Sequence, residues 1–168
     1  MKKVVKFGGS SLASAEQFRK VSEIIHADKD RRYVVPSAPG KRGSKDTKVT
    51  DMLYDCYSAA GDAEALTKKI AAIQARYQEI IDGLGLELSL EEQFKEIRER
   101  FEQHAGSDYA ASRGEYLNGI VLAAYLEYDF IDAAEVICFD EDGVFDAEKT
   151  DEKMRARLGE TERAVIPG

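Results

Sequence analysis

Apolar residues recur along the chain at two different spacings, and the order of these spacings predicts a parallel sheet. Residues 4–7 form a short apolar run that the glycines and serines of residues 8–11 end at once, as expected of a strand that leads into a loop. Residues 14–25 then have helical spacing at Phe18, Val21, Ile24 and Ile25. A second apolar run at 33–35 stops at Pro36. This strand, helix and strand are typical of a βαβ unit.

The middle of the chain has the spacing of four helices. The first covers residues 50–60, and the second, which Gly83 is expected to end, carries an apolar stripe of Leu66, Ile70, Ile73, Tyr77 and Ile80. Ser89 and Glu92 have the spacing of a capping box for the third helix. Residues 108–128 contain more apolar residues, so we expect this fourth helix to be more deeply buried.

Toward the end of the chain the pattern returns to strands. Strands are expected at 130–133, 136–139 and 164–166. Residues 142–143 are expected to turn a hairpin, and a polar helix is expected at 150–158. The fold class predicted from this order is α/β: a three-layer α/β/α sandwich with a mainly parallel sheet. Because only Pro167 and Gly168 follow the last strand, we expect the fold to be truncated inside a domain.

Composition narrows the class of protein. Of the 168 residues, 43% are apolar and 33% are charged, and the formal net charge is -8. This balance predicts a folded domain and argues against nucleic acid and anionic membranes as partners. The two cysteines have no metal-ligand spacing, and the amino terminus does not have the pattern of a signal peptide. We therefore expect a cytoplasmic protein without a metal site of its own.

Lys6 and the turn that follows it are the first candidates for chemistry. Apolar neighbours on both sides of Lys6 predict a strand buried on both faces, where an ammonium group needs a partner. Gly8, Gly9 and Ser10 allow backbone N–H groups to converge on an anion near a helix start. The spacing is not that of a Walker A loop. A tight turn beside a lysine that extends to the surface explains the same residues.

Ser37 and Thr50 are candidates because of their places after the second strand and at a helix start. Ligands of open α/β sheets bind at the carboxyl ends of the strands, so Ser37 and the Gly8–Gly9 turn are expected at one edge. Alternatively, Ser37 bonds local backbone and Thr50 is a helix N-cap. Residues 41–48 carry four positive charges and one negative charge, which suits either an anion-binding loop or a solvated one.

Glu115 stands out within the predicted helix at 108–128. Its neighbours on the same helix face are small or polar: Ala111, Ser112, Asn118 and Gly119. A carboxylate on such a strip has room for a ligand and accepts hydrogen bonds from an amino group. A solvent-facing glutamate is the alternative. His26 and His104 have no acid or nucleophile at a useful spacing, and we interpret them as structural.

Five segments together resemble the aspartokinase branch of the amino-acid kinase family: residues 6–13, 36–42, 48–53, 112–117 and 164–168. They occur in the order of the family across the whole chain. The first is shared with other amino-acid kinases, whereas 112–117 is much more specific to aspartokinases and argues against a kinase for another acidic substrate. The resemblance implies that residues 1–168 are the amino-terminal portion of a catalytic domain, without the ACT regulatory domains.

The resemblance also implies roles for the candidate residues. Phosphate and ATP would be held by Lys6, Gly8, Gly9 and Ser10, with Lys6 as the catalytic residue. L-aspartate would be bound by Ser37, Thr50 and Glu115, with Glu115 facing the α-amino group. The reaction would be phosphorylation of the aspartate side-chain carboxylate by ATP with Mg²⁺, the first step toward lysine, threonine and methionine. The full-length enzyme would be a homo-oligomer.

One departure from the family pattern limits what this chain is expected to do. Aspartokinases carry a later Arg-Gly-Gly-Ser-Asp segment that completes the substrate and phosphate sites, and residues 1–168 do not contain it. Residues 106–108 resemble its end but precede the Glu115 helix, so we assign them no such role. We therefore expect the isolated chain to be inactive. The alternative function is a non-catalytic aspartate-binding or interaction module that retains the front half of the kinase fold.

Overall fold

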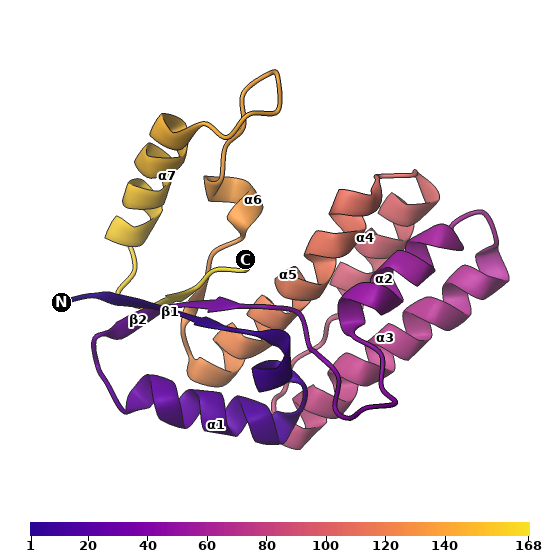
Figure 1. The fold of residues 1–168 in the computed structure, drawn as a ribbon, viewed down its shortest axis with the longest axis horizontal. Helices are drawn as coiled ribbons and strands as arrows, with labels where there is room; N and C mark the ends of the chain where they lie inside the picture. The colour runs from indigo at the N-terminus through magenta and orange to yellow at the C-terminus, as the bar shows by residue number, and fades with distance from the viewer.

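A four-stranded parallel sheet forms the centre of the computed structural model, which describes residues 1–168 (Figure 1). Its strands, in the spatial order β1-β2-β4-β3, are β1 (Lys3–Phe7), β2 (Arg31–Pro36), β4 (Ala164–Val165) and β3 (Asp129–Phe130). Every neighbouring pair is parallel. The predicted mainly parallel α/β fold is thereby confirmed.

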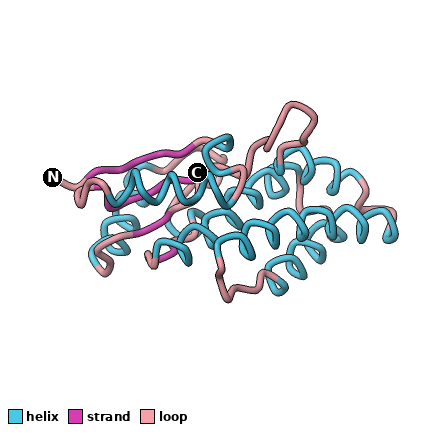
Figure 2. Tube along the Cα trace, turned by 90° about the horizontal axis from the view of Figure 1, so that it is seen from below, coloured by secondary structure: helices cyan, strands magenta, loops and turns pink.

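The helices lie on both faces of this sheet and beyond one of its ends. They are η1 (Gly9–Leu12), α1 (Ala15–His26), α2 (Val49–Ser58), α3 (Ala63–Leu84), α4 (Glu91–Glu102), α5 (Ser107–Leu126), α6 (Ala133–Val136) and α7 (Ala147–Gly159). Figure 1 shows α1 and α5 on one face and α6 and α7 on the other. Figure 2 shows the strands gathered toward one end, with the bundle of α2, α3 and α4 filling the other. The carboxyl ends of β1 and β2 point toward this bundle.

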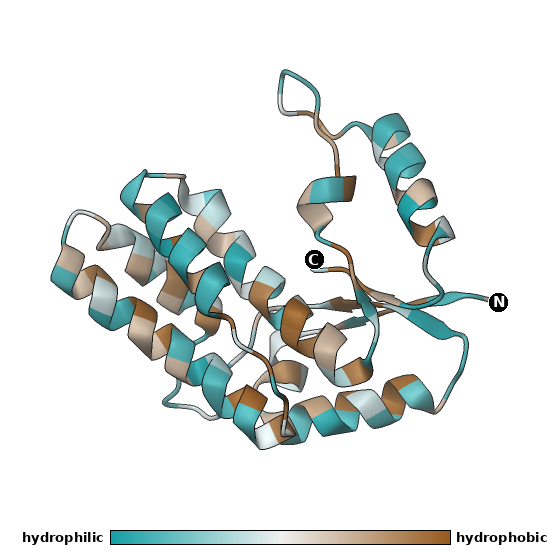
Figure 3. Cartoon of the chain, turned by 180° about the vertical axis from the view of Figure 1, so that it is seen from behind, coloured by the Kyte–Doolittle hydropathy of each residue, from teal (hydrophilic) through white to brown (hydrophobic).

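Alternate residues of the central strands β2 and β4 pack into two apolar clusters, one on each face of the sheet. Val34 and Val165 are paired neighbours, are fully buried, and join the main core that α1 and α5 cover. Tyr33 and Ala164 point to the other face, where Val136 of α6 and residues of α7 pack. Figure 3 shows hydrophobic residues on α5 where it meets the sheet and mostly hydrophilic residues on α7. No helix combines the length and the apolarity that crossing a bilayer requires.

Helix boundaries follow local capping chemistry. The Ser14 side chain accepts a hydrogen bond from the Gln17 amide, which confirms the predicted start of α1. The predicted end of α3 at Gly83 is wrong, because α3 continues to Leu84 and its C-cap is Gly85, whose φ of 70° is the left-handed conformation that glycine adopts readily. Gly83 serves packing instead, since a Cβ there would lie 2.7 Å from the Cβ of Ala15.

Three further local predictions are corrected. Ile24, placed on the buried stripe of α1, is 48% exposed. The cap of α4 is Leu90, and the Ser89 hydroxyl only accepts a hydrogen bond from the Glu91 amide. Residues 136–139 do not form a strand: residue 136 ends the short helix α6, which the Asp132 side chain caps, and only residue 139 makes an isolated bridge. The predicted hairpin is present as an isolated antiparallel bridge between residues 139 and 145.

The prediction that the first strand is buried on both faces is wrong. β1 is an edge strand that pairs only with β2. Val4 is 67% exposed, and Lys6 on the same side of the strand is also exposed. Apolar neighbours in sequence do not reveal whether a strand lies at the centre or at the edge of a sheet. The Lys6 ammonium group is therefore hydrated and available to a ligand, and needs no buried partner.

Candidate active site

A cavity of about 490 Å³ opens where the carboxyl ends of β1 and β2 meet the helical bundle. It is lined by Gly9, Ser10, Ser37, Ala38, Pro39, Gly40, Lys41, Lys48, Thr50 and Glu115. Five of the predicted site residues are in this set, although they come from four separate segments of the chain. Lys6 and Gly8, which we also predicted, do not line the cavity. Lys6 lies in β1, and Gly8 lies between β1 and the lining residue Gly9.

The turn after β1 and the turn after β2 are in direct contact. The Ser37 amide donates to the Phe7 carbonyl oxygen over 3.0 Å, and the Gly40 amide donates to the Gly9 carbonyl oxygen over 2.8 Å. A Cβ on Gly9 would lie 2.8 Å from the Ala38 oxygen, and a Cβ on Gly40 would lie 2.6 Å from the Gly9 carbonyl carbon. Only glycine fits at either position, so the two turns form one backbone-lined wall.

The amino terminus of α2 faces the same cavity. Lys48 is its N-cap and supplies no side-chain cap, so the alternative of Thr50 as N-cap is wrong. The Val49 amide donates to the Pro39 oxygen over 3.1 Å, which fixes the helix start against the turn after β2. Because Lys48 and Thr50 line the cavity, the positive end of the α2 dipole is available to an anion there.

Helix α5 brings Glu115 to the opposite wall. Gly114 allows close packing, since a Cβ on it would lie 2.7 Å from the Cβ of Ala38. The buried Tyr77 hydroxyl donates to the Gly114 oxygen over 2.7 Å. Asn118, one turn further along, donates to the Ser37 oxygen over 2.7 Å. These contacts hold the backbone of α5 around Glu115 against the turn after β2, and Glu115 itself is half-buried in the cavity lining.

The charged groups in or beside the cavity are lysines and one carboxylate, that of Glu115, and the excess of positive charge favours anionic ligands. Burial raises the pKa of Glu115, and the positive charge of Lys6 opposes that rise. Lys6, Lys41 and Lys48 form no ion pairs within the chain. The carboxylate is therefore poised to accept hydrogen bonds from an ammonium group, while the lysines are free for phosphate or carboxylate oxygens.

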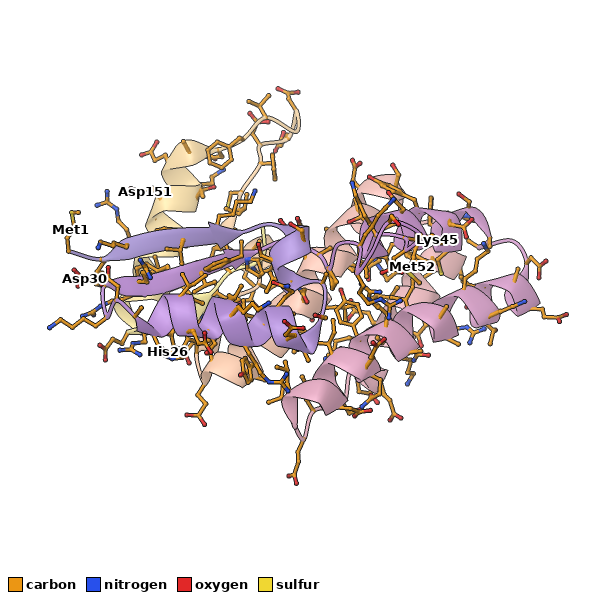
Figure 4. The ribbon with its side chains drawn as sticks, turned by 60° about the horizontal axis from the view of Figure 1, so that its bottom comes forward. Met1, His26, Asp30, Lys45, Met52 and Asp151 are labelled. Atoms are coloured by element: carbon orange, nitrogen blue, oxygen red, sulfur yellow. The ribbon has the colours of Figure 1, made fainter.

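The basic loop at 41–48 divides its charges between the cavity and the protein. Lys41 and Lys48, at its ends, line the cavity. Arg42 is bound to Asp46, with its Nε 2.9 Å from the carboxylate, and also to Glu79. Figure 4 shows Lys45 in the half of the molecule that lies away from Met1. Anion binding by this loop stays a prediction, and the two lysines at its ends are the residues placed for it.

The residue that sequence reasoning missed is Arg76 of α3. It is only 4% exposed and donates hydrogen bonds to the carbonyl oxygen of Gly40 in the turn after β2 and to that of Ala13, directly after η1. A signal was available, because Arg76 lies among Ile73, Tyr77 and Ile80 on the apolar face of its helix. A charged residue at such a position must have buried partners.

A model of the amino acid kinase family matches residues 1–165. The chain belongs to this family. Aspartokinase 3 of Bacillus subtilis is 40% identical over 145 residues, which are 80% of this chain and 31% of that protein. An aspartokinase of Chlamydia trachomatis is 33% identical over 129 residues, or 73% of this chain and 27% of that protein. Within the amino acid kinase family, this chain is therefore similar to aspartokinases.

Solved structures give the same placement. The aspartate kinase of Clostridium acetobutylicum superposes with a TM-score of 0.93 at 48% identity, over 100% of this chain and 39% of that one. E. coli aspartokinase III in complex with aspartate and ADP superposes with a TM-score of 0.76 at 21% identity, over 100% of this chain and 40% of that one, which shows the shared fold. The chain thus spans about a third of the length of its curated relatives.

Proposed function

We propose that this chain is the amino-terminal portion of the catalytic domain of an aspartate kinase, without the ACT regulatory domains. The enzyme would transfer the γ-phosphoryl group of ATP to the side-chain carboxylate of L-aspartate. The observation that carries the proposal is the shared cavity, in which Glu115, three lysines in or beside it and two contacting turns meet at the carboxyl ends of parallel strands. Similarity to aspartokinases supports the same assignment.

The two ends of aspartate match opposite walls of the cavity. Glu115 accepts hydrogen bonds from the α-ammonium group, which replaces the water that the half-buried carboxylate otherwise needs. Ser37 and Thr50 bind the carboxylates, helped by the positive end of α2. The substrate is then oriented with its side chain toward the turn after β1. E. coli aspartokinase III, which shares the fold, has been solved with aspartate and ADP bound.

Phosphate is assigned to the turn after β1. Gly9 has no side chain that separates its backbone from a ligand, and the Ser10 hydroxyl is beside it in the lining. Gly8 has open space around it. Lys6, exposed on β1, neutralises the charge that develops on the transferred phosphoryl group. These residues hold and neutralise phosphate, and none is required to remove a proton.

The chemistry needs no general base, because a carboxylate is already a nucleophile at neutral pH. The β-carboxylate attacks the γ-phosphorus in line, the bond to the bridging oxygen breaks, and ADP leaves as the acyl phosphate forms. The work of the residues is positioning and charge neutralisation. Mg²⁺ would be bound by the ATP phosphates, as is usual for this ion in phosphoryl-transfer enzymes.

The test is an assay of the full-length protein that contains this chain. L-aspartate, Mg-ATP and hydroxylamine are combined, and the acyl phosphate is trapped as aspartyl hydroxamate. We expect ATP-dependent hydroxamate with L-aspartate and none with L-asparagine, which lacks the nucleophilic carboxylate. The Glu115→Gln variant should lose most of this activity. Aspartate binding without hydroxamate would instead favour the non-catalytic binding module, and neither binding nor product would refute both functions.

A further inference from the structure

Arg76 is a buried arginine whose position in the fold is unusual. It lies on α3. The residue as a whole is 4% exposed, and its side chain is 3% exposed. It does not line the candidate active-site cavity, and both of its terminal nitrogens are bound to protein oxygens. Arginine is seldom fully buried without a set of specific partners. The partners of Arg76 therefore indicate what the fold uses it for.

The guanidinium group of Arg76 contacts three segments that are far apart in sequence. One terminal nitrogen, Nη2, donates to the Gly40 oxygen over 2.8 Å and to the Ala13 oxygen over 3.1 Å. The other, Nη1, is 2.6 Å from the Asp46 carboxylate. Ala13 follows the turn after β1, Gly40 ends the turn after β2, and Asp46 belongs to the basic loop. One planar cation thus joins all three loops around the cavity.

The contact to Gly40 reaches the cavity wall through the backbone. Gly40 accepts from Arg76 with its carbonyl oxygen and donates with its amide to the Gly9 oxygen over 2.8 Å. Because a planar guanidinium presents several donors in a fixed geometry, it can hold two carbonyl oxygens and a carboxylate at once. A lysine ammonium group in the same place would not reproduce this arrangement.

Asp46 completes the arrangement. Its carboxylate also accepts from the backbone amide and the side chain of Arg42, and these hydrogen bonds hold the pKa of Asp46 below its ordinary value. Asp46 therefore remains ionised opposite the buried guanidinium. Arg42 shares Asp46 with Arg76 but forms no hydrogen bond to Ala13 or Gly40, which makes it a matched control.

We propose that Arg76 is a positioning residue that fixes the phosphate-binding turn after β1 relative to the aspartate-binding turn after β2. This inference rests on the proposed function. In-line transfer depends on the separation of phosphorus and attacking oxygen, and displacement by about 1 Å is enough to cost about a hundredfold in rate. Glu115 and Thr50 are held by α5 and α2, so aspartate binding itself depends little on Arg76.

The experiment compares Arg76→Ala, Arg76→Lys and Arg42→Met in the full-length protein. For both Arg76 variants we expect kcat to fall by about a hundredfold with little change in the KM for aspartate. Low concentrations of guanidinium ion should partly restore kcat in Arg76→Ala and not in Arg76→Lys. Arg42→Met should retain kcat. Thermal unfolding of each variant tests whether it is folded at the assay temperature. If Arg76→Ala does not fold, Arg76→Lys alone is compared with the wild type.

Amide hydrogen exchange separates positioning from general stability and does not depend on catalysis. We expect Arg76→Ala or Arg76→Lys to accelerate exchange at the Gly40 amide well beyond the amides in the middle of α3, and Arg42→Met to leave it unchanged. Equal acceleration throughout, or unchanged kcat in a folded Arg76 variant, would overturn the inference. If the wild-type protein forms no aspartyl phosphate, the proposed function fails, while local exchange at Gly40 still decides what Arg76 holds.

Discussion

Asn118 on α5 donates a hydrogen bond from its side-chain amide to the main-chain oxygen of Ser37 over 2.7 Å, which links residues 81 positions apart in the chain. Asn118 is fully buried, and its side-chain oxygen has no partner. A buried amide of this kind is retained at a cost in solvation. The hydrogen bond from Asn118 to Ser37 fixes the position of the turn after β2 relative to α5, the helix that carries Glu115.

Replacing Asn118 with alanine should therefore weaken both stability and binding. The Ser37 oxygen loses its buried donor, and we expect the free energy of unfolding to fall by about 2 kcal/mol. Aspartate affinity should also fall, because Ser37 is no longer fixed. Urea unfolding and calorimetric titration measure the two effects. Asn118→Asp has the same shape but turns an acceptor toward the Ser37 oxygen, so it should be the less stable of the two at neutral pH.

Aspartate binding should depend on pH through Glu115. Burial raises its pKa above the ordinary value of 4.5, and only the ionised carboxylate accepts from the substrate ammonium group. We expect affinity for L-aspartate to decrease as pH falls through this raised pKa. Glu115→Gln should bind about tenfold or more weakly at neutral pH, since a charge-assisted hydrogen bond is lost. Its affinity should show no such pH dependence, and a parallel decline in both proteins would assign the titration to another group.

The same carboxylate should reduce the stability of the ligand-free protein. A carboxyl group with a raised pKa contributes stability below its unfolded pKa, and this contribution is lost as pH rises through its folded pKa. Glu115→Gln, which stays neutral, should therefore gain in free energy of unfolding relative to wild type as pH rises from acid to neutral. Chemical unfolding at several pH values tests this. A gain toward acid pH would mean that the native site stabilises the charged form.

The charge of Lys6 should lower the pKa of Glu115. Its positive charge lowers the pKa that burial raises, so Lys6→Met should move the pH profile of aspartate binding to higher pH. The NMR titration of the Glu115 side chain measures this shift directly. Lys20→Met is the control, because Lys20 is an exposed lysine of α1 paired with Glu16. An identical profile in Lys6→Met would remove Lys6 from the vicinity of the carboxylate.

Two neighbouring glycines should respond differently to alanine. A Cβ on Gly9 would lie 2.8 Å from a backbone oxygen, whereas nothing lies within 4 Å of a Cβ on Gly8. We expect Gly9→Ala to cost about 1–3 kcal/mol in the free energy of unfolding and to impair nucleotide binding. Gly8→Ala should stay within about 0.5 kcal/mol of wild type. Denaturant unfolding of the two variants gives the comparison, and equal stability would contradict the contact between the turns.

Much of the fold was predictable because its elements carry strong local signals. The cap at Ser14 and the apolar run of residues 108–128 define α1 and α5. Short elements were less predictable, since residue 136 ends the capped helix α6 and residues 137–139 form no strand. Whether β1 lies at an edge depends on which elements cover it, and this information is not contained in the neighbours of Val4.

The candidate site was predictable where residue type and chain position agree. Gly9, Ser37 and Glu115 were predicted from strand ends and one helix strip, and the cavity contains all three. Arg76 was missed although its place on the apolar face of α3 was a signal, because the carbonyl oxygens that it binds belong to the main chain and form no pattern in the sequence. Residues that contact a ligand can be predicted from their chemical type and position in the sequence. Residues that hold the backbone around the ligand are harder to predict in this way.

The contact between Gly9 and Gly40 also restricts how this protein can change over evolutionary time. Each glycine occupies the space that a side chain on the other would need. A single substitution at either position meets main-chain atoms, which cannot be removed by a second substitution nearby. A larger residue in either turn therefore requires the main chain of the other turn to move. The two short segments constrain each other, although 31 positions separate their glycines in the sequence.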